Sequence, residues 1–393
     1  MPAPGRVKPP VILFMGRIFE VPWGGVRETA EALLRAAAPL CASAGRRIDV
    51  LVPKRGLCPV KHPAVREVVL RKFRGNIILW DHWTVRRHAN RRRHAVLYNP
   101  KLVLPECLRI PGFTTLHDLM YFPQPAKYNW REYLLLDSLY MRLMVPRTVR
   151  RAPLTHVVSH HTAKDAAELF PGVAPKRFRA IHWGIDAEKY APAEPTPDDT
   201  VAWSGLQARG VKGPFVFYSG GLSKRKNVSL LAQAFEMFQR RHPEFQLVLT
   251  GGSKPTMQEP EVMRLLHMIP PGRVVRLGAV TALQLRQLYQ RAAMYVFPSL
   301  YEGFGLPPLE AQAAHCPVIC SNATSLPEVV GNSALLFDPR SVKELREAME
   351  AALRPEVRAD LIAKGLRNVE RFRWENTARE WLAMADEVAG RGL

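Results

Sequence analysis

The sequence has few cysteines and no long hydrophobic segment. Five cysteines are scattered over 393 residues, an odd number that favours reduced thiols over a disulfide-stabilised secreted domain. No apolar run approaches the roughly 18–20 residues needed to cross a bilayer. The first apolar run, Val11–Met15, is too short for the hydrophobic region of a secretory signal and is typical of a buried strand. We therefore expect a chain that begins near Met1 and stays in the cytoplasm.

Acidic residues are also scarce, and their shortage is uneven. The chain has 56 Lys and Arg against 35 Asp and Glu, a net charge of +21. Residues 1–196 hold 32 basic and 15 acidic residues, whereas residues 197–393 hold 24 and 20. The excess is concentrated in residues 54–109, with 14 basic against 3 acidic. A partner attracted by this charge is therefore expected to meet the first half of the chain.

Both halves alternate short apolar segments with helical ones, which is typical of parallel sheets with crossover helices. The expected strands are Val11–Met15, Ile48–Val52, Ala95–Tyr98, Thr114–Leu116, His156–Ser159 and Arg179–His182, then Phe215–Tyr218, Gln246–Thr250, Val274–Leu277, Met294–Phe297, Val318–Cys320 and Ala334–Phe337. Glu28–Ala44 has the apolar spacing of a helix. Ala191–Thr200, rich in proline and acidic residues, is a predicted linker with a domain boundary near 195–210. The predicted fold is α/β, with two doubly wound parallel sheets whose ligands bind at the carboxyl ends of the strands.

The most informative segment follows the predicted strand Met294–Phe297. A turn containing Gly303 and Gly305 leads into an Ala-rich helix expected to open at Pro307. Backbone N–H groups and the dipole of such a helix favour an anionic ligand. Glu302 and Glu310 bracket the turn with seven residues between them and can accept hydrogen bonds from hydroxyls. The pattern favours a nucleotide-sugar, which is anionic in the middle and hydroxylated on either side.

Several motifs together resemble the retaining glycosyltransferases of family 4. They are Glu302-x7-Glu310, Tyr218–Asn227, Leu230–Phe235, Leu247–Gly252, Pro317–Asn322, Leu326–Gly331 and Phe372–Ala378, with shorter matches at Gly24–Arg27, Leu116–Leu119 and Trp183–Asp186. The resemblance implies the GT-B fold of two facing Rossmann-like domains. It implies an acceptor-side domain over residues 1–196, a nucleotide-sugar domain over 210–371, and a final helix over 372–393 that packs back on the first domain.

Arg225 and Lys226 follow a predicted strand and a Gly-Gly turn, where two cations would neutralise a leaving diphosphate in place of a metal. Glu302 would bind sugar hydroxyls. By resemblance, Glu310 would bind the ribose. The remaining expected donor-site residues are Gly220, Gly221, Gly303, Phe304, Gly305 and Leu306. Many relatives have a further arginine where Gly221 stands, so the phosphate contact is expected to rest on Arg225 and Lys226.

In the first half, His117 and Asp118 follow a predicted strand end. By resemblance, His117 contacts the sugar and Asp118 holds the loop or the His117 ring, although a lone histidine is more often a surface or core residue. Gly24 and Gly25 allow close backbone approach to a ligand. Arg27 is either a phosphate contact or an ordinary arginine on a helix face.

A basic stretch from 71 to 93 combines cations with tryptophans, a composition typical of segments that dock on anionic lipid. Its candidate docking residues are Arg71, Lys72, Arg74, Trp80, Trp83, Arg86, Arg87, Arg91, Arg92 and Arg93. The alternative is that the apolar residues from Ile77 to Trp80 face the domain core. No platform of stacking aromatics indicates RNA binding.

The resemblance thus implies a transferase on the inner face of the cytoplasmic membrane. It would move a sugar, with mannose from GDP-mannose as a candidate, to a lipid-linked or anionic saccharide acceptor of an envelope polysaccharide or lipopolysaccharide pathway. No cofactor or metal is expected. The alternatives are a GT-B sugar phosphorylase, a nucleotide-sugar epimerase and a non-catalytic GT-B scaffold on the membrane.

Overall fold

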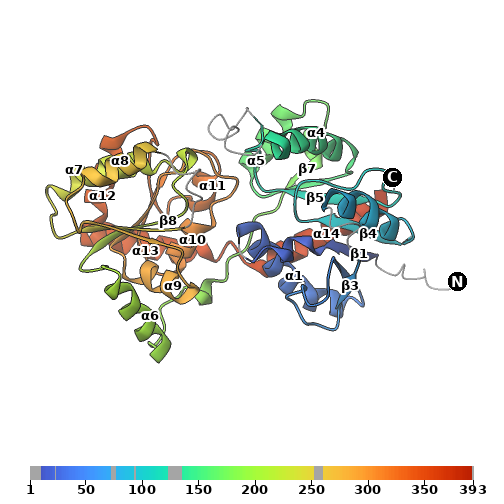
Figure 1. The fold of residues 1–393 in the computed structure, drawn as a ribbon, viewed down its shortest axis with the longest axis horizontal. Coiled ribbons are helices and arrows are strands. Elements are labelled where there is room, and N and C mark those ends of the chain that lie inside the picture. The colour runs from blue at the N-terminus through green and yellow to red at the C-terminus, as the bar shows by residue number, and fades with distance from the viewer. Residues whose placement is uncertain are drawn as a thin grey trace. The chain divides into compact units, whose positions relative to one another are not determined.

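The computed structural model describes residues 10–22, 24–71, 77–92, 94–122, 135–251 and 260–391. These residues form two compact units (Figure 1). The first unit contains the described residues up to Gly184 together with Trp374–Arg391, and the second contains those from Ile185 to Arg373. The division therefore falls before residue 185, earlier than the 195–210 boundary expected from composition.

The first unit is built on a seven-stranded parallel sheet in the order β3-β2-β1-β4-β5-β6-β7. Its strands are β1 (Val11–Met15), β2 (Ile48–Val52), β3 (Val65–Val69), β4 (Ala95–Asn99), β5 (Gly112–Leu116), β6 (Thr155–Val157) and β7 (Phe178–Ala180). Its helices are η1 (Gly16–Glu20), α1 (Gly25–Ser43), α2 (Ile77–Leu79), η2 (Trp80–Val85), α3 (Arg86–Ala89), α4 (Leu135–Arg151), α5 (His160–Leu169), η3 (Pro175–Arg177) and α14 (Trp374–Arg391). The strand order reverses between β1 and β4, as in doubly wound folds.

The last helix of the chain, α14, completes the core of the first unit. Its Trp381 side chain is fully buried, and its ring lies 4.9 Å from that of Tyr98 and 5.9 Å from that of Phe113. Asp386 of α14 also forms a salt bridge with Arg46. These contacts explain why a helix 190 residues away in sequence belongs to this unit.

The chain leaves the first unit at Gly184 and re-enters it at Trp374. A Cβ atom on residue 184 would lie 2.6 Å from Trp374 Cα and 2.7 Å from its Cγ. These Trp374 atoms belong to the backbone and to the base of the side chain and cannot easily move, so only glycine fits at residue 184.

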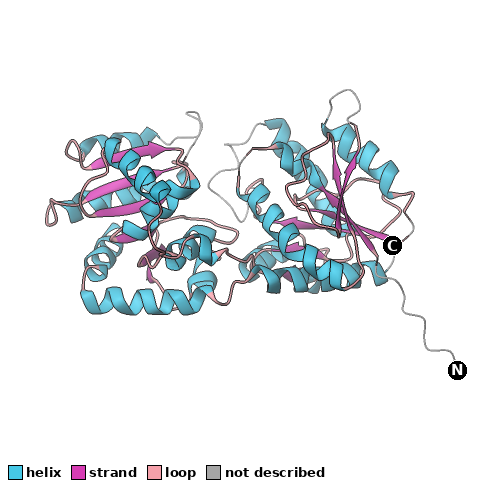
Figure 2. Ribbon diagram, turned by 90° about the horizontal axis from the view of Figure 1, so that it is seen from below, coloured by secondary structure: helices cyan, strands magenta, loops and turns pink. Residues whose placement is uncertain are grey.

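The second unit has a six-stranded parallel sheet in the order β10-β9-β8-β11-β12-β13. Its strands are β8 (Phe215–Ser219), β9 (Gln246–Thr250), β10 (Val274–Gly278), β11 (Met294–Phe297), β12 (Val318–Ser321) and β13 (Leu335–Phe337). Its helices are η4 (Ala187–Lys189), α6 (Pro197–Ala208), η5 (Lys224–Lys226), α7 (Val228–Gln239), α8 (Pro260–Met268), α9 (Ala282–Arg291), α10 (Leu306–Ala313), α11 (Leu326–Val330), α12 (Val342–Ala352) and α13 (Pro355–Val369). In Figure 2 the strands of each sheet lie between layers of helices.

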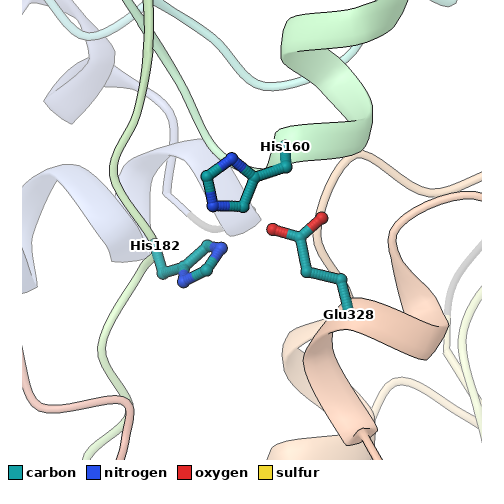
Figure 3. A group of neighbouring side chains, drawn as sticks. All are labelled: His160, His182 and Glu328. Carbon is teal, nitrogen blue, oxygen red and sulfur yellow. The ribbon is translucent and has the colours of Figure 1, made fainter.

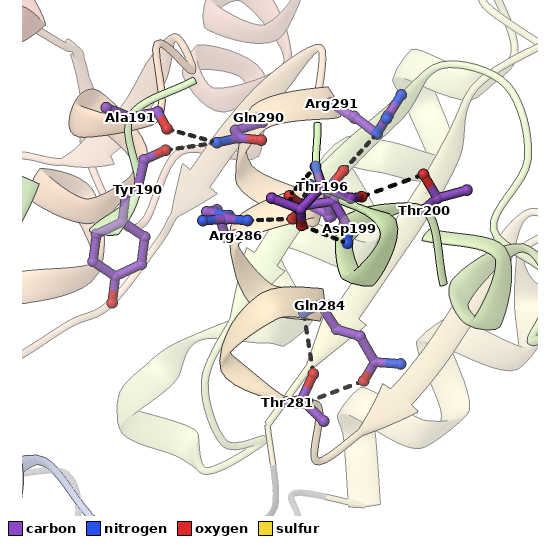
Figure 4. A network of polar contacts seen from close by, with 11 residues as sticks. Tyr190, Ala191, Thr196, Asp199, Thr200, Thr281, Gln284, Arg286, Gln290 and Arg291 are labelled. Atoms are coloured by element: carbon purple, nitrogen blue, oxygen red, sulfur yellow. Dashed lines mark hydrogen bonds and ion pairs between the residues drawn. The ribbon is translucent and has the colours of Figure 1, made fainter. Parts of the chain in front are cut away.

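The predicted linker at Ala191–Thr200 is wrong in its second half, because α6 starts at Pro197. Thr196 Oγ1 caps this helix by accepting a hydrogen bond from Asp199 N. The Asp199 carboxylate in turn accepts one from Thr196 N, which completes a capping box. Asp199 also forms a salt bridge with Arg286 of α9, and Gln290 of α9 donates to the carbonyl oxygens of Tyr190 and Ala191 (Figure 4). The proline and acidic residues that suggested a linker are the start signal of a packed helix.

Among the residues that the structure describes, no helix combines the length and the apolar character needed to cross a membrane.

Candidate active site

Two loops of the second unit leave the sheet at the same edge. Strands β8 and β11 are parallel neighbours, so the segments that follow their carboxyl ends lie close together. The β8 loop contains Gly220, Gly221 and η5, and the β11 loop contains Glu302 and Gly305.

Three charged side chains from these loops meet. Lys226 Nζ lies 2.7 Å and Arg225 Nη1 lies 2.9 Å from the same oxygen, Glu302 Oε1. Arg225 Nη1 also donates to Tyr301 O at 2.7 Å, and Leu300 N donates to Arg225 O at 2.8 Å. The exposed fractions of the three charged side chains are only 13–15%. Two cations thus share one carboxylate and keep one net positive charge at the edge of the sheet.

The protonation state of Glu302 follows from this arrangement. Burial alone raises the pKa of its carboxyl group, but the charges of Arg225 and Lys226 outweigh burial and lower the pKa to about 2. Glu302 is therefore ionised throughout the neutral range. Such a carboxylate is a good hydrogen-bond acceptor and, because its charge is already shared by two cations, a weak nucleophile.

The loop that carries Glu302 is fixed by hydrogen bonds to the next loop of the sheet. Glu302 N donates to Thr324 Oγ1 at 3.0 Å, while Ser325 Oγ lies 2.9 Å from Glu302 O and 2.7 Å from Phe304 O. Gly305 ends the loop with a φ of +114°, and a Cβ there would lie 2.7 Å from Leu326 Cδ2. The position of the Glu302 carboxylate is therefore set by its backbone, before any ligand binds.

Glu310 is held differently from the prediction. Helix α10 starts at Leu306, so Glu310 is its fifth residue and lies just beyond the first turn. Its carboxylate accepts a hydrogen bond of 2.9 Å from Tyr289 Oη. Burial and the Glu310 charge raise the pKa of Tyr289, so its hydroxyl stays protonated and donates. A buried tyrosine thus helps to orient this carboxylate.

The expected anion site at the start of α10 has fewer amide donors than a typical helix. Pro307 and Pro308 occupy two of its first four positions and carry no N–H group. The amide donors among these four positions are therefore those of Leu306 and Leu309.

Gly220 and Gly251 bring the ends of β8 and β9 into close contact. Gly220 N donates to Thr250 O at 2.9 Å, and Gly251 has a φ of +113°. A Cβ at residue 251 would overlap the Gly220 carbonyl group. The neighbouring Gly221 accepts a hydrogen bond of 2.7 Å from Tyr218 Oη. At the carboxyl ends of β8 and β9, the sheet edge is therefore formed by the backbone of these glycines and not by side chains.

In the first unit, His117 and Asp118 follow β5 at its carboxyl end. His117 Nε2 lies 2.7 Å from Pro100 O, so this nitrogen carries the proton and Nδ1 is an acceptor. Burial lowers the His117 pKa to about 4, so the ring is neutral. Asp118 Oδ1 accepts from Met120 N at 3.2 Å and thereby holds its own loop.

The Cβ positions of Gly24 and Gly25, at the start of α1, are surrounded by open space. Gly24 caps the helix with a φ of +129°, and a Cβ atom at this position would have no heavy atom within 4 Å. Arg27 pairs with Glu31 one turn further along the same helix, at 3.3 Å. This contact is the one expected of an arginine on a helix face, and the predicted phosphate contact stays untested.

A histidine pair at the same edge as His117 was not predicted. His160 starts α5 directly after β6, and His182 follows β7. Their rings pack edge to face, with centroids 5.5 Å apart (Figure 3). The sequence held part of the signal, because His160 follows the predicted strand His156–Ser159, whereas His182 was counted as the last residue of the predicted strand Arg179–His182. Glu328, also drawn in Figure 3, belongs to α11 of the second unit.

The basic stretch forms a helical segment from Ile77 to Ala89, and one of its predicted docking residues is wrong. Trp80 is fully buried in the core, where its Nε1 donates to Leu70 O at 2.6 Å. Trp83 is 53% exposed and remains a candidate, as do the described arginines Arg71, Arg86, Arg87, Arg91 and Arg92. Lys72, Arg74 and Arg93 lie outside the described residues.

Two parallel sheets and a loop-borne cluster of two cations and a carboxylate define the class of GT-B glycosyltransferases. Residues 206–368 match the family described as Glycosyl transferases group 1, and residues 23–189 match Glycosyltransferase Family 4. The chain is 30% identical to the O-antigen chain mannosyltransferase B of Escherichia coli over 72% of this chain and 71% of that protein. The chain belongs to the family 4 glycosyltransferases.

Other similarities agree with this assignment. A serotype-specific mannosyltransferase, WbdA of Escherichia coli, is 36% identical over 67% of this chain but only 32% of its own length. A glycosyltransferase from Rickettsia africae has the same fold, with a TM-score of 0.71, 14% identity, and coverage of 97% of this chain and 99% of that one. HepE from Anabaena, solved with UDP-glucose, has a TM-score of 0.69, 18% identity, and coverage of 95% and 98%.

Proposed function

We propose that this glycosyltransferase moves a hexose, with mannose as the first candidate, from a nucleoside-diphosphate sugar to a polysaccharide or lipid-linked acceptor, with retention of anomeric configuration. The observation that carries the proposal is the cluster of Arg225, Lys226 and Glu302 at the carboxyl edge of the second sheet. The similarity to an O-antigen mannosyltransferase supports mannose and a surface glycan product.

In the proposed reaction, Arg225 and Lys226 bind the donor diphosphate. The bond between the sugar C1 and the diphosphate oxygen breaks, and its electron pair stays on the diphosphate. The two cations neutralise this charge as it develops. The acceptor hydroxyl attacks C1 from the face that the diphosphate leaves, and its proton passes to a diphosphate oxygen.

Glu302 acts as an acceptor for sugar hydroxyls and as an anchor for the two cations, not as a covalent nucleophile. Its low pKa, together with the two contacts under 3 Å to Lys226 and Arg225, supports this role. Glu310, oriented by Tyr289, binds the ribose hydroxyls, and neutral His117 contacts the transferred sugar.

We propose that transfer requires no divalent metal, because Arg225 and Lys226 supply the positive charge that a metal would otherwise supply. The proposal does not depend on which nucleotide the donor carries.

The proposed acceptor is carried by or near an anionic membrane, on which the first unit docks peripherally. Ile78, Leu79 and Trp83 are 49%, 40% and 53% exposed on the helical segment that also carries Arg86 and Arg87. Exposed apolar residues beside cations are the usual composition of a segment that lies in a lipid interface.

The test is a donor screen followed by analysis of the product. The purified chain is incubated with GDP-, UDP- and ADP-sugars, and release of the nucleoside diphosphate is measured. The preferred donor is then supplied with a lipid-linked saccharide, and the anomeric configuration of the product is determined by NMR. We expect GDP-mannose to be turned over fastest and an α-linked product. Failure to hydrolyse any donor would contradict the proposed transfer, and a product of inverted configuration would contradict retention.

A further inference from the structure

A second basic site lies in the first unit. A surface pocket of about 350 Å³ is lined by Trp83, Arg86, Arg87, Asn90, Arg91, Cys107 and Arg109. Four of these seven residues are arginines and none is acidic. The volume falls at the lower end of the range of about 300–1,000 Å³ that is usual for small-molecule sites.

The four arginines of this pocket are not paired with carboxylates of the described residues. Within the described chain, Arg86, Arg87, Arg91 and Arg109 form no salt bridge. Other arginines of the unit do pair with carboxylates. Arg66 Nη2, for example, lies 2.5 Å from Asp49 Oδ2. Four uncompensated guanidinium groups around one pocket create a strong local positive potential.

The walls of the pocket are tied together by one side chain. Asn90 Nδ2 donates to Cys107 O at 3.1 Å, and Asn90 Oδ1 accepts from Arg109 N at 2.7 Å. Asn90 follows α3, and the loop of Cys107 and Arg109 precedes β5. The Arg86 guanidinium lies 5.0 Å above the Trp83 ring, which further restricts its position. The backbone of the pocket is therefore set without a ligand.

The pocket is remote from the chemistry of its own unit. The helical segment 77–89 begins near the carboxyl end of β3, where Trp80 bonds to Leu70 O, and ends just before β4 begins. Arg109 likewise precedes β5, whereas His117 follows it. Because all strands of the sheet are parallel, the pocket lies toward the amino edge and His117 at the carboxyl edge. A ligand in the pocket is thus distinct from the reacting sugar.

We propose that this pocket binds a phosphate group, either on a lipid headgroup or on a soluble phosphorylated compound. Arginine is suited to this ligand because its planar group donates two parallel hydrogen bonds to phosphate oxygens. The exposed Trp83 ring offers an apolar neighbour for the group that the phosphate carries. If the phosphate belongs to a lipid headgroup, this inference rests on the proposed function, in which the first unit docks on an anionic membrane. The pocket is then the contact that makes docking selective for phosphate.

Cys107 provides a local reporter of occupancy. Its side chain is exposed, whereas Cys41, Cys316 and Cys320 are buried and Cys58 is half-buried. In a Cys58→Ser background, labelling by the neutral reagent N-ethylmaleimide therefore reports access to Cys107. Inorganic pyrophosphate, compared with sodium chloride at equal ionic strength, is expected to slow labelling saturably, on the order of tenfold at full occupancy. Pyrophosphate bound at Lys226 would leave this rate unchanged.

The matched variants remove three charges from the pocket or three from elsewhere in the unit. Arg86→Gln, Arg91→Gln and Arg109→Gln together are expected to abolish protection of Cys107. In the control, Arg35, Arg55 and Arg150 are each replaced by Gln, which removes the same charge from exposed positions outside the pocket. This control should retain the protection of Cys107. Full labelling of the wild-type chain at saturating pyrophosphate, or equal loss of protection in both variants, would overturn the proposal.

A vesicle arm separates the two sources of phosphate. Vesicles containing phosphatidylglycerol are compared with vesicles of equal charge density in which oleate supplies the negative charge. If a headgroup is the ligand, only the first kind protects Cys107, and the pocket variant sediments with it on the order of 100-fold less strongly than the control variant. If pyrophosphate protects and vesicles do not, the ligand is soluble. Donor hydrolysis measured in parallel is expected to be unchanged, so a failure of the pocket is distinguishable from a failure of the proposed transfer.

Discussion

The two units each gather arginine or lysine side chains, and they treat the charge in opposite ways. In the second unit, Arg225 and Lys226 share the carboxylate of Glu302 and are about 15% exposed. In the first unit, Arg86 and Arg109 line an open pocket and form no salt bridge within the described chain. A paired and largely covered cluster has a fixed geometry, which suits bond breaking. In an open cluster without salt bridges, the positive potential is available to attract a ligand and is screened by salt.

The largest expected effect is on the paired cluster. Glu302→Gln and Lys226→Ala should each lower the transfer rate by on the order of 100-fold or more, because each removes a preorganised contact at the point where charge develops. The rate is measured with the natural donor at saturating acceptor.

Lys224→Ala is the matched control for this experiment. Lys224 lies in the same short helix η5 and is exposed, so its removal should leave the rate within about twofold of wild type. Equal losses in Lys224→Ala and Lys226→Ala would mean that the positive charge of the loop matters and the pairing with Glu302 does not.

The pairing should also be visible in stability at acid pH. Glu302 has a pKa of about 2 in the fold against an ordinary value of 4.5, so its ionised form stabilises the second unit by roughly 3 kcal/mol above pH 4.5. Because the folded pKa is the lower one, this stabilisation is lost as the pH falls from 4.5 toward 2. Urea unfolding of wild type and Glu302→Gln across this range should show the two curves converging. A difference that stays constant with pH would contradict the ionised pair.

Salt should distinguish the clusters. Binding of the first unit's arginines to anionic vesicles should weaken at least about tenfold between 0.1 M and 1 M salt, since the Debye length falls from about 10 Å to about 3 Å. The part that resists salt is expected to depend on Trp83, and Trp83→Ala should remove it. Cosedimentation measures both. Vesicle binding that is indifferent to salt would show that the arginines do not carry it.

Removal of metal ions should have the smallest effect. With Arg225 and Lys226 in contact with the diphosphate, donor hydrolysis in EDTA should stay within about twofold of the untreated rate. Activity lost in EDTA and restored by magnesium or manganese would show that the two cations are insufficient.

The sequence was a good guide where the physical signal is a continuous apolar run. The central strands β1, β2, β9 and β11 have the predicted bounds, because strands buried on both faces are mostly apolar, even though β2 contains Asp49 and β9 begins with Gln246. Edge strand β3 was missed: its sequence, Val-Arg-Glu-Val-Val, has two charged residues and is partly exposed. The other edge strands, β7, β10 and β13, overlap predicted strands, so the two charged residues of β3, and not its place at the edge, account for the miss.

Side-chain orientation was harder to predict than element position. Trp80 begins a π-helical turn, and Val85, five residues later, is also buried. The composition of the basic stretch, which placed Trp80 among the docking residues, does not indicate which side of this turn faces the core. At the donor site, the meeting of Lys226 and Glu302 followed from adjacent strand ends. The link between Tyr289 and Glu310 did not, because it depends on tertiary packing of α9 against α10.

One measurement tests most directly the claim that the paired cluster binds the donor diphosphate. The Kd values of the donor's nucleoside diphosphate and monophosphate are determined for wild type, Lys226→Ala and Lys224→Ala. If Lys226 contacts the terminal phosphate, Lys226→Ala should weaken diphosphate binding by at least about tenfold and leave monophosphate binding unchanged, with no effect in the control. Equal weakening for both nucleotides, or none for the diphosphate, would contradict the account.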